Sequence, residues 1–511
     1  MLAAYRNLLK TAHGRSRLAW VGYIFVTLLA GILRFYNLAN PAKLVFDETY
    51  YVKDAYTLSQ SGVELSWPNN PNPAFEASKV HTFLNDPAFV VHPPLGKWLI
   101  AVGMNIFGAD NSFGWRFSSA LFGTLTVALT ILVAWQLMRS VTWSIAAGFL
   151  MAIDGHAIVL SRTALLDGFL GFFALLAFYF VLRDREQNRL RILLHPSINV
   201  IWNRPWLMAA AVALGAATGV KWSGVWFAII FGAYVCVSEA LFRLRVEKIE
   251  GETANHHDKP IALAIWQSLA NLVLMVPLFL ATYLATWAGW LGSDRGWDAK
   301  WASAPINQFW GIFNLVPQKL QSLWHYHQDA LNFHVNLHTP HSYASNPLTW
   351  LLLYRPTSFF YEGAANGEAG CTLSEGCSSA ITALGNPVIW YAALIALVLI
   401  VIRYFKHRES VPGLILLGIA AGYLPWLVFM NRTVFQFYAI TFLPWLVLAL
   451  TFILKNWLQG KASELRQQAE QRLLIFFALA TAVSVYFYPI WIGLQVSYWF
   501  WSAHMWIPSW I

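Results

Sequence analysis

The sequence predicts an all-α integral membrane protein with about eleven transmembrane helices. Hydrophobic residues make up 58% of the 511-residue chain and charged residues only 12%, whereas a soluble domain carries roughly 25% charged residues. Eleven apolar runs approach or exceed the length of about 20 residues that a helix needs to cross a bilayer. The 27 Trp residues suit the two membrane–water interfaces, where amphipathic rings gather. This composition excludes disordered, collagen-like and disulfide-rich proteins.

The apolar runs fall into two groups, seven before residue 289 and four after residue 386. A further segment, 95–108, is amphipathic, and we expect it to lie on the membrane surface. The first run follows a basic segment but lacks a cleavage site, so we interpret it as an uncleaved helix. The runs are 18–36, 116–138, 141–160, 164–182, 206–220, 222–242, 261–288, 387–402, 411–430, 434–454 and 473–493.

The basic residues predict the orientation, because cytoplasmic loops carry an excess of Lys and Arg. With the N-terminus in the cytoplasm, the short cytoplasmic segments hold 21 of the 34 Lys and Arg residues. The others are spread through much longer external loops. An odd number of helices then places the C-terminus outside. Because the net charge of +9 follows this topology, we expect no nucleic-acid partner.

Two external segments, 37–115 and 289–386, are large enough to contain a functional site. We therefore divide the chain into an N-terminal membrane module, 1–288, the large external loop, 289–386, and a C-terminal four-helix region, 387–511. Cys371 and Cys377 lie in the large loop, where either a disulfide or two free thiols fits the sequence. The short cytoplasmic loops contain no Gly-rich phosphate-binding loop.

Two adjacent carboxylates follow the first predicted helix on its outer side. Asp47 and Glu48, in FDETYY (46–51), repel each other unless a cation or a catalytic role holds them. The alternative is a plain N-cap for a short helix that starts at Thr49. His92, in HPPLGK (92–97), would by itself be a structural histidine more often than not.

Four cations reach the same outer boundary of the membrane. Ionisable residues at membrane depth are costly and therefore suggest function, although we expect Arg162 and Asp167, in SRTALLD, to form a structural ion pair beside Asp154. Phosphate groups are bound by Arg and Lys, and a free carboxylate can accept a proton from a nucleophile. The residues thus predict an external site for a phosphorylated lipid. The cations are Arg116, Arg162, Lys221 and Arg432.

Five motifs occur in a characteristic order within residues 35–225: FDETYY, HPPLGK, GWRFSSALFG, SRTALLD and GVKWSG. At these motifs the chain resembles the protein O-mannosyltransferases, membrane-embedded GT-C glycosyltransferases that use a polyprenyl- or dolichyl-phosphate-mannose donor. The last four helices resemble the family's C-terminal membrane region. Eukaryotic members carry a MIR domain after the seventh helix, whereas 289–386 contains no such repeats. The chain therefore resembles a bacterial member, which implies a multi-pass protein of the plasma membrane.

The resemblance implies a role for each candidate residue. Asp47 would be the base that deprotonates the acceptor Ser or Thr hydroxyl, and Glu48 would assist by orienting the acceptor or the base. Arg116, Lys221, Arg162 and Arg432 would bind the donor phosphate or hold the site together. Supporting roles fall to His92, Asp154 and Asp167.

The implied reaction is an inverting transfer of mannose to a polypeptide that emerges from the secretion channel, with no metal or other cofactor. Two alternatives stay open. A GT-C transferase with a glycan, lipid or cell-wall acceptor would use the same donor site. A lipid or sugar transporter would be expected to show repeated halves with polar residues at the membrane midplane, but the sequence shows no matching halves and its ionisable residues crowd one face.

Overall fold

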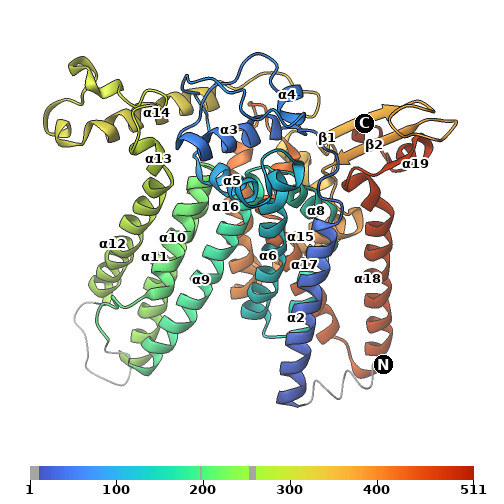
Figure 1. Ribbon diagram of the computed structural model, residues 1–511. Coiled ribbons are helices and arrows are strands. Elements are labelled where there is room, and N and C mark those ends of the chain that lie inside the picture. The colour runs from blue at the N-terminus through green and yellow to red at the C-terminus, as the bar shows by residue number, and fades with distance from the viewer. Residues whose placement is uncertain (1–10, 196–197, 252–259) are drawn as a thin grey trace.

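A computed structural model describes residues 11–195, 198–251 and 260–511. It is mostly helical, and its long helices run between two ends of the molecule, called lower and upper as in Figure 1. The chain enters its first described helix at the lower end and finishes at the upper end. Arg6, Lys10 and Lys259, which contributed to the predicted orientation, lie outside the described residues.

Each of the eleven predicted apolar runs contains a helix. Their lengths follow from uninterrupted apolar sequence, since a helix satisfies every backbone polar group internally. The helices are α2 (Ala12–Phe35), α6 (Ser112–Met138), α7 (Val141–Ile153), α9 (Asp167–Leu194), α10 (Pro205–Val220), α11 (Gly224–Gly251), α12 (Pro260–Thr286), α15 (Pro387–His407), α16 (Ser410–Val428), α17 (Leu443–Gln459) and α18 (Ser463–Trp491).

Fewer helices than eleven are long and apolar enough to cross a membrane. Within the described ranges there are seven, or eight if the bent pair α7 and α8 (Gly155–Arg162) counts as one span. That run breaks at Asp154, whose side chain caps α8 by accepting from Ala157 N, and the two helices meet at 59°. The run 434–454 also divides, into the 3-10 helix η5 (Gln436–Thr441) and then α17.

Short elements cover the upper end (Figure 1). The segment 37–115 folds into α3 (Glu48–Ser61), α4 (Asn72–Glu76) and α5 (Leu95–Phe107). The expected amphipathic segment is α5, which packs against α3, α6 and α10. The segment 289–386, with the residues just before it, forms α13 (Ala288–Leu291) and α14 (Gln318–Val335), with the 3-10 helices η1 (Trp301–Ser303), η2 (Pro305–Asn307), η3 (Gly311–Leu315) and η4 (Pro347–Leu352).

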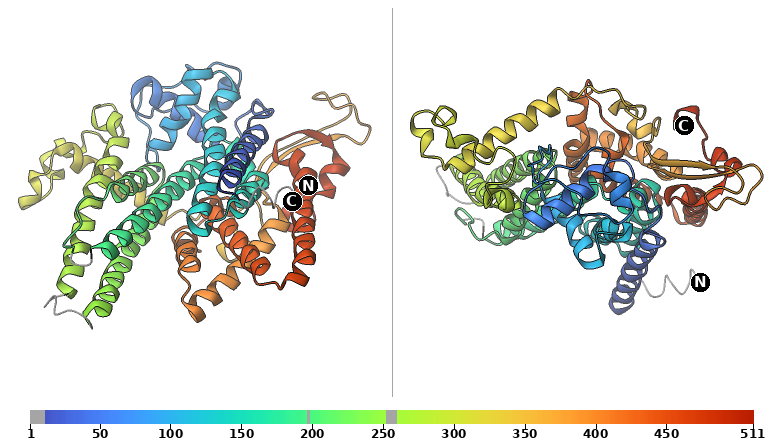
Figure 2. Two further views of the ribbon diagram at one scale, coloured as in Figure 1. Left: turned by 90° about the horizontal axis from the view of Figure 1, so that it is seen from below. Right: turned by 45° about the horizontal axis from the view of Figure 1, so that its top comes forward.

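The all-α prediction is wrong for a small region at the upper end. Strands β1 (Ser358–Ala364), β2 (Cys377–Thr382) and β3 (Gln495–Ser497) form an antiparallel sheet in that order, followed by α19 (Tyr498–Ala503) and η6 (Pro508–Trp510). A Cys371–Cys377 disulfide closes the turn between β1 and β2, which settles the cysteine alternatives. Figure 2 shows this sheet on the opposite side of the molecule from η2 and η3.

Buried side chains bind the upper elements to the membrane helices. A cluster that includes Val52, Phe75, Ile100, Trp115 and Phe169 joins α3, α4 and α5 to α6 and α9. The largest cluster fills the space between the helices of both halves of the chain. At about 0.8 kcal/mol per buried CH₂ group, such contacts hold the segment 37–115 in a fixed position at the upper end of the bundle.

Candidate functional site

A large cavity opens at the upper end of the molecule, with a volume of about 1290 Å³. It is larger than the pockets of typical small-molecule sites, which hold roughly 300–1,000 Å³. Its walls come from α3, the segment 88–92, the turn between α10 and α11, α12, α14 and the turn after α16. Ionisable and aromatic side chains on these walls include Asp47, Tyr51, Asp54, His92, Lys97, Lys221, Trp222, Tyr283, His327, His334, Arg432 and Tyr438.

Asp47 lies at the N-cap of α3 and lines this cavity. The preceding residue, Phe46, has a left-handed backbone with φ of 47°, a strained conformation for a bulky side chain. Its ring stacks on Phe359 with the centroids 4.9 Å apart and makes edge contacts with Phe435 and Phe437. Aromatic packing from two other parts of the chain therefore holds the bend that presents Asp47.

The pKa of Asp47 is raised to about 6 from an ordinary value of 3.8. Burial is the main cause, and it outweighs the nearby Lys221 ammonium, which lowers the pKa. The Asp167 carboxylate raises it further, while hydrogen bonding from Tyr51 lowers it. A carboxylate with a pKa near 6 is ionised at neutral pH and is a stronger base than an exposed aspartate, as general-base catalysis requires.

Tyr51 and Asp54 extend the same face of α3 into the cavity. They follow Asp47 by four and seven residues, the spacing that aligns side chains on one side of a helix. Burial raises the pKa of Asp54 to about 7, although Lys97 lowers it. Sequence analysis missed both residues, and the helical spacing from Asp47 was the signal that could have found them.

Glu48 and Arg116 do not line the cavity, although both were expected at the site. They form a fully buried ion pair in which Glu48 accepts two hydrogen bonds from Arg116, both 2.8 Å long. Glu48 also accepts from Val45 N and Ala164 N. The remaining N–H groups of Arg116 donate hydrogen bonds to the carbonyls of Leu38, Pro41 and Lys43. All five donors of this guanidinium are thus used inside the protein.

Lys221 pairs with Asp167, its ammonium lying 3.0 Å from both carboxylate oxygens. The ammonium also lies 4.3 Å from the centroid of the Tyr438 ring, a cation–π contact. Lys221 lines the cavity. The expected Arg162–Asp167 ion pair is therefore wrong, because Lys221 takes the carboxylate from the end of α10.

Arg162 and Asp154 form hydrogen bonds with backbone groups and do not line the cavity. The guanidinium of Arg162 donates to the carbonyls of Arg34, Tyr36 and Asn37 and so fixes the end of α2. Buried Asp154 accepts from Asn386 N and the Trp390 indole as well as capping α8. Neither residue is among those that line the cavity.

Arg432 lines the cavity from the turn after α16. No described residue forms an ion pair with it, and its buried Nε has no hydrogen-bond partner in the described part of the chain. An unpartnered guanidinium N–H is costly when buried. Arg432 is therefore ready to bind an anion that enters the cavity.

His92 and His334 stack in the cavity wall with ring centroids 5.0 Å apart. Burial lowers the pKa of His334 to about 4, and burial together with the Lys221 charge holds that of His92 well below its ordinary value. Both imidazoles are therefore neutral at pH 7. His334 Nε2 pairs with Val91 O at 2.8 Å, while both Nδ1 atoms lack a partner among the described residues.

A third buried ion pair supports this wall. Lys97 lies 2.5 Å from Glu64 and donates to the His92 carbonyl at 3.1 Å. This arrangement fixes the segment that carries His92. The sequence motif HPPLGK contains both Lys97 and His92, but its spacing gives no indication of the partner Glu64.

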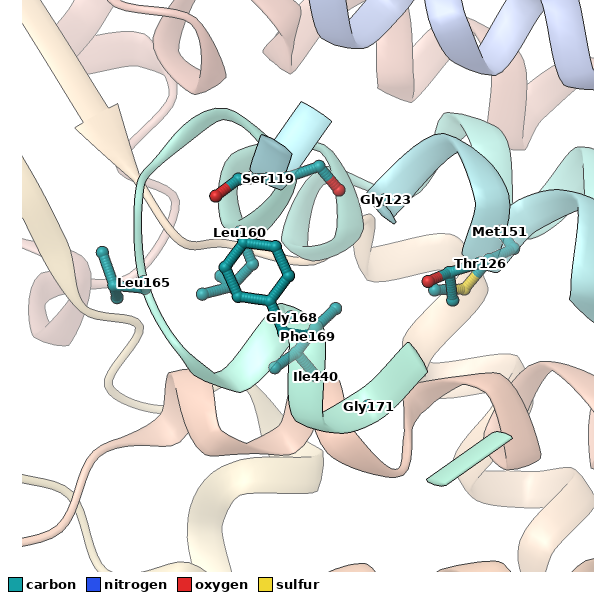
Figure 3. A pocket seen from close by; sticks show the side chains of 11 residues that line it. Ser119, Gly123, Thr126, Met151, Leu160, Leu165, Gly168, Phe169, Gly171 and Ile440 are labelled. Atoms are coloured by element: carbon teal, nitrogen blue, oxygen red, sulfur yellow. The ribbon is translucent and has the colours of Figure 1, made fainter. Parts of the chain in front are cut away.

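Two other features lie away from the cavity. Asp298, His325 and Asp329 have ligand atoms within 4.8 Å of one another, but none of them is among the residues that line the cavity. A void of about 20 Å³ lies between α6, α8, α9 and η5, lined by residues such as Ser119, Thr126 and Phe169 (Figure 3). A void of this size holds one water molecule at most.

Two family models match the chain. One, described as dolichyl-phosphate-mannose-protein mannosyltransferase, matches residues 107–291. The other, described as the C-terminal four-transmembrane region of protein O-mannosyltransferase, matches residues 319–510. The polyprenol-phosphate-mannose–protein mannosyltransferase of Mycobacterium tuberculosis is 34% identical over 514 residues, which cover 96% of this chain and 92% of that protein.

Solved structures share the fold. The Saccharomyces cerevisiae protein O-mannosyltransferase Pmt1-Pmt2 complex bound to the sugar donor superposes with a TM-score of 0.70 and 16% identity, covering 100% of this chain and 94% of that one. The Archaeoglobus fulgidus oligosaccharyltransferase gives a TM-score of 0.53 and 14% identity, covering 96% of this chain and 57% of that one. These likenesses assign the GT-C fold.

Proposed function

The chain belongs to the dolichyl-phosphate-mannose-protein mannosyltransferase family, and we propose that it moves mannose from polyprenyl-phosphate-mannose to Ser and Thr hydroxyls of polypeptides. The observation that carries this proposal is the juxtaposition of Asp47, Lys221 and Arg432 around one cavity. It brings together a base and two cations. The relative from M. tuberculosis is named for a protein acceptor, which favours this reading over a glycan, lipid or cell-wall acceptor.

Lys221 and Arg432 would bind the donor phosphate. The Arg432 guanidinium has an unpartnered buried Nε, and Arg suits phosphate because its planar fork donates two hydrogen bonds at once. Lys221 is paired with Asp167 through both carboxylate oxygens, and because an ammonium has three N–H groups, it can keep that pair and donate one hydrogen bond to the phosphate. Fixed cations stabilise the phosphate that leaves, and no general acid is required.

Asp47 would act as the base. An acceptor hydroxyl oxygen attacks the anomeric carbon of mannose, the bond from that carbon to the phosphate oxygen breaks, and the carboxylate of Asp47 takes the hydroxyl proton. The polyprenyl phosphate departs with the bonding electrons. One displacement inverts the anomeric configuration, from β in the donor to α in the product.

Glu48 and Arg116 would have a positioning role in place of the catalytic and phosphate-binding roles expected for them. The four hydrogen bonds of Glu48 leave no lone pair for substrate, and the two residues tie the FDE turn to α6 and to the turn between α8 and α9. Arg162 and Asp154 would have an indirect supporting role, because Arg162 holds the end of α2 and Asp154 holds the backbone just before α15.

The prenyl chain of the donor would lie beside the cavity opening between α11, α12 and α16. The cavity wall includes Trp226, Leu280 and Val428, which come from these three helices and are exposed. Apolar side chains that are exposed on membrane helices face lipid. A phosphate held at Lys221 and Arg432 would then leave its chain in the bilayer.

We further infer a topology of eleven spans with a cytoplasmic N-terminus and an external C-terminus in a bacterial plasma membrane. The excess of Lys and Arg in the short loops supports it, as does the placement of α3, α5 and α14 at one end of the bundle (Figure 1). The module 1–288 would hold the donor site, 289–386 would form its outer wall, and 387–511 would supply Arg432. Acceptor polypeptide would reach this face from the secretion channel.

The test uses purified protein in lipid with polyprenyl-phosphate-mannose and a Ser/Thr-rich peptide, with and without a chelator. Mass spectrometry scores the addition of one hexose. We expect transfer that does not depend on the chelator, because Lys221 and Arg432 neutralise the phosphate. Donor consumption that requires a cell-wall fraction and leaves the peptide unmodified would overturn the protein acceptor.

A further inference from the structure

The apolar loop, residues 305–316, projects from the upper end between η1 and α14. Its sequence, PINQFWGIFNLV, contains no charged residue, and neither does the whole stretch 301–318. Large apolar side chains of this loop are 67–92% exposed, more than almost all of those on the membrane helices. These side chains are Ile306, Trp310, Ile312, Phe313 and Leu315.

Polar contacts on the inner side hold the apolar loop in a defined shape. The buried Gln321 side chain accepts from Phe309 N and donates to Val316 O, both at 2.7 Å. Asn307 Nδ2 donates to the Trp301 carbonyl at 2.8 Å. The loop thus satisfies polar groups internally and turns its apolar side chains outward. This polarity is the reverse of a water-exposed loop and matches a surface in contact with lipid.

The position of the apolar loop also fits lipid. Figures 1 and 2 show η2 and η3 reaching outward from the end of α13, which continues from α12 at the edge of the bundle. The outer surface of α12 carries exposed Val273, Val276 and Leu280, so the helix from which this part of the chain extends is itself apolar on its exposed side. Aromatic side chains such as Trp310 favour the membrane–water interface.

We propose that the apolar loop inserts into the membrane–water interface beside α12, in the outer leaflet of the membrane that the helices span. It would anchor α14, because Gln321 of that helix holds both halves of the loop. Further along α14, His327 and His334 line the cavity, and Tyr326 packs on Trp287 with ring centroids 5.3 Å apart. Insertion would thus fix the outer wall of the cavity relative to the lipid surface that supplies the donor. This consequence rests on the proposed function, whereas the insertion itself does not.

The test is spin-label accessibility of the full-length protein in bilayer nanodiscs, in a Cys236→Ser background that leaves the disulfide intact. Ile312→Cys reports on the apolar loop, and Leu315→Cys repeats the measurement if one label perturbs packing. Gln60→Cys, on the exposed end of α3, is the water-exposed control, and Val276→Cys, on α12, is the lipid-exposed control. Oxygen, which partitions into lipid, and a water-soluble nickel complex are the two relaxation agents.

We expect oxygen to relax the labels at 312 and 315 more strongly than the nickel complex does, as at 276. At 60 we expect the opposite order, with relaxation by the nickel complex dominant. Relaxation of the loop labels by nickel, as at 60, would overturn the proposal. Protection from both agents would also overturn it, because the loop would then be covered by protein, such as a second copy of this chain. The readout needs no turnover, so failure of the proposed transferase activity would not affect it.

Discussion

Asp47 and Glu48 are neighbours in the chain with the same charge, yet they occupy opposite environments. Glu48 is fully buried and accepts four hydrogen bonds. Asp47 faces a cavity of about 1290 Å³ and has a pKa raised to about 6. Arg116 and Arg432 show the same contrast. Arg116 uses every N–H donor inside the protein, whereas Arg432 leaves Nε without a described partner.

A charged residue near the upper ends of the membrane helices is therefore not by itself a reacting group. A buried ion pair with all its hydrogen bonds made stabilises a particular backbone arrangement, and removing one partner is strongly destabilising. A group with unused donors or lone pairs beside a cavity can exchange them for substrate. These two kinds of residue, which we call saturated and cavity-facing, should respond differently to substitution.

The largest effect on stability is expected for a saturated residue. Arg116→Gln leaves the Glu48 carboxylate buried without its cation, which costs about 3–5 kcal/mol, so the thermal unfolding temperature in detergent should fall sharply. Adding Glu48→Gln should restore part of the loss, because the uncompensated charge is then removed. An unchanged unfolding temperature combined with lost transfer would instead make Arg116 a substrate-binding residue.

A smaller effect, on activity alone, is expected for the cavity-facing Arg432. A hydrogen bond to a charged group contributes about 1.5–3 kcal/mol, so Arg432→Gln should lower kcat/KM for the lipid donor by roughly 10- to 100-fold. Its unfolding temperature should stay near that of the wild type. Arg295→Gln, which alters an exposed arginine outside the cavity, is the matched control. Equal activity of the two variants would remove Arg432 from the donor site.

The pH dependence tests Asp47 directly. Its ionised form accepts the proton, and its pKa is about 6, so kcat/KM should be level above that pH and fall about tenfold per pH unit below it. Lys221→Met should move the break to higher pH, because the Lys221 charge lowers this pKa. A break near pH 4, the value of an ordinary aspartate, would contradict the assignment.

The smallest effect is expected for an ion pair that is neither saturated nor cavity-facing. Lys43 and Glu362 lie 2.8 Å apart, but both side chains are about half exposed. Exposed pairs contribute about 0–1 kcal/mol, so Glu362→Gln should change neither the unfolding temperature nor transfer appreciably. A large loss of transfer in this variant would show that the surface beside β1 takes part in acceptor binding.

The membrane helices were predictable because an uninterrupted apolar run dictates a helix whatever its neighbours are. The breaks were less so. Asp154 interrupts one run because its carboxylate has partners at Asn386 and Trp390, more than 200 residues away. The small sheet was missed because its strands have three to seven residues and one of them, β3, lies at the far end of the chain.

The candidate site was predictable in place but only partly in detail. Motifs located Asp47 and Lys221, whereas Arg432 was found only as a charged residue at the end of an apolar run, where such residues are expected to gather at one face. The pairing of Asp167 with Lys221, and not with Arg162, was not predictable, because the sequence places both cations at the same boundary as that carboxylate. Likewise, only the folded chain brings His334 beside His92.

The most direct test of the difference between saturated and cavity-facing residues compares Asp47→Asn with Glu48→Gln. Each variant is reconstituted with polyprenyl-phosphate-mannose and peptide, and hexose transfer and thermal unfolding are measured on the same preparation. Asp47→Asn should lose transfer by about 10²- to 10⁴-fold and unfold at the wild-type temperature, whereas Glu48→Gln should unfold at a lower temperature. Wild-type transfer by Asp47→Asn, or a stable Glu48→Gln protein without transfer, would contradict the account and make Glu48 the reacting carboxylate.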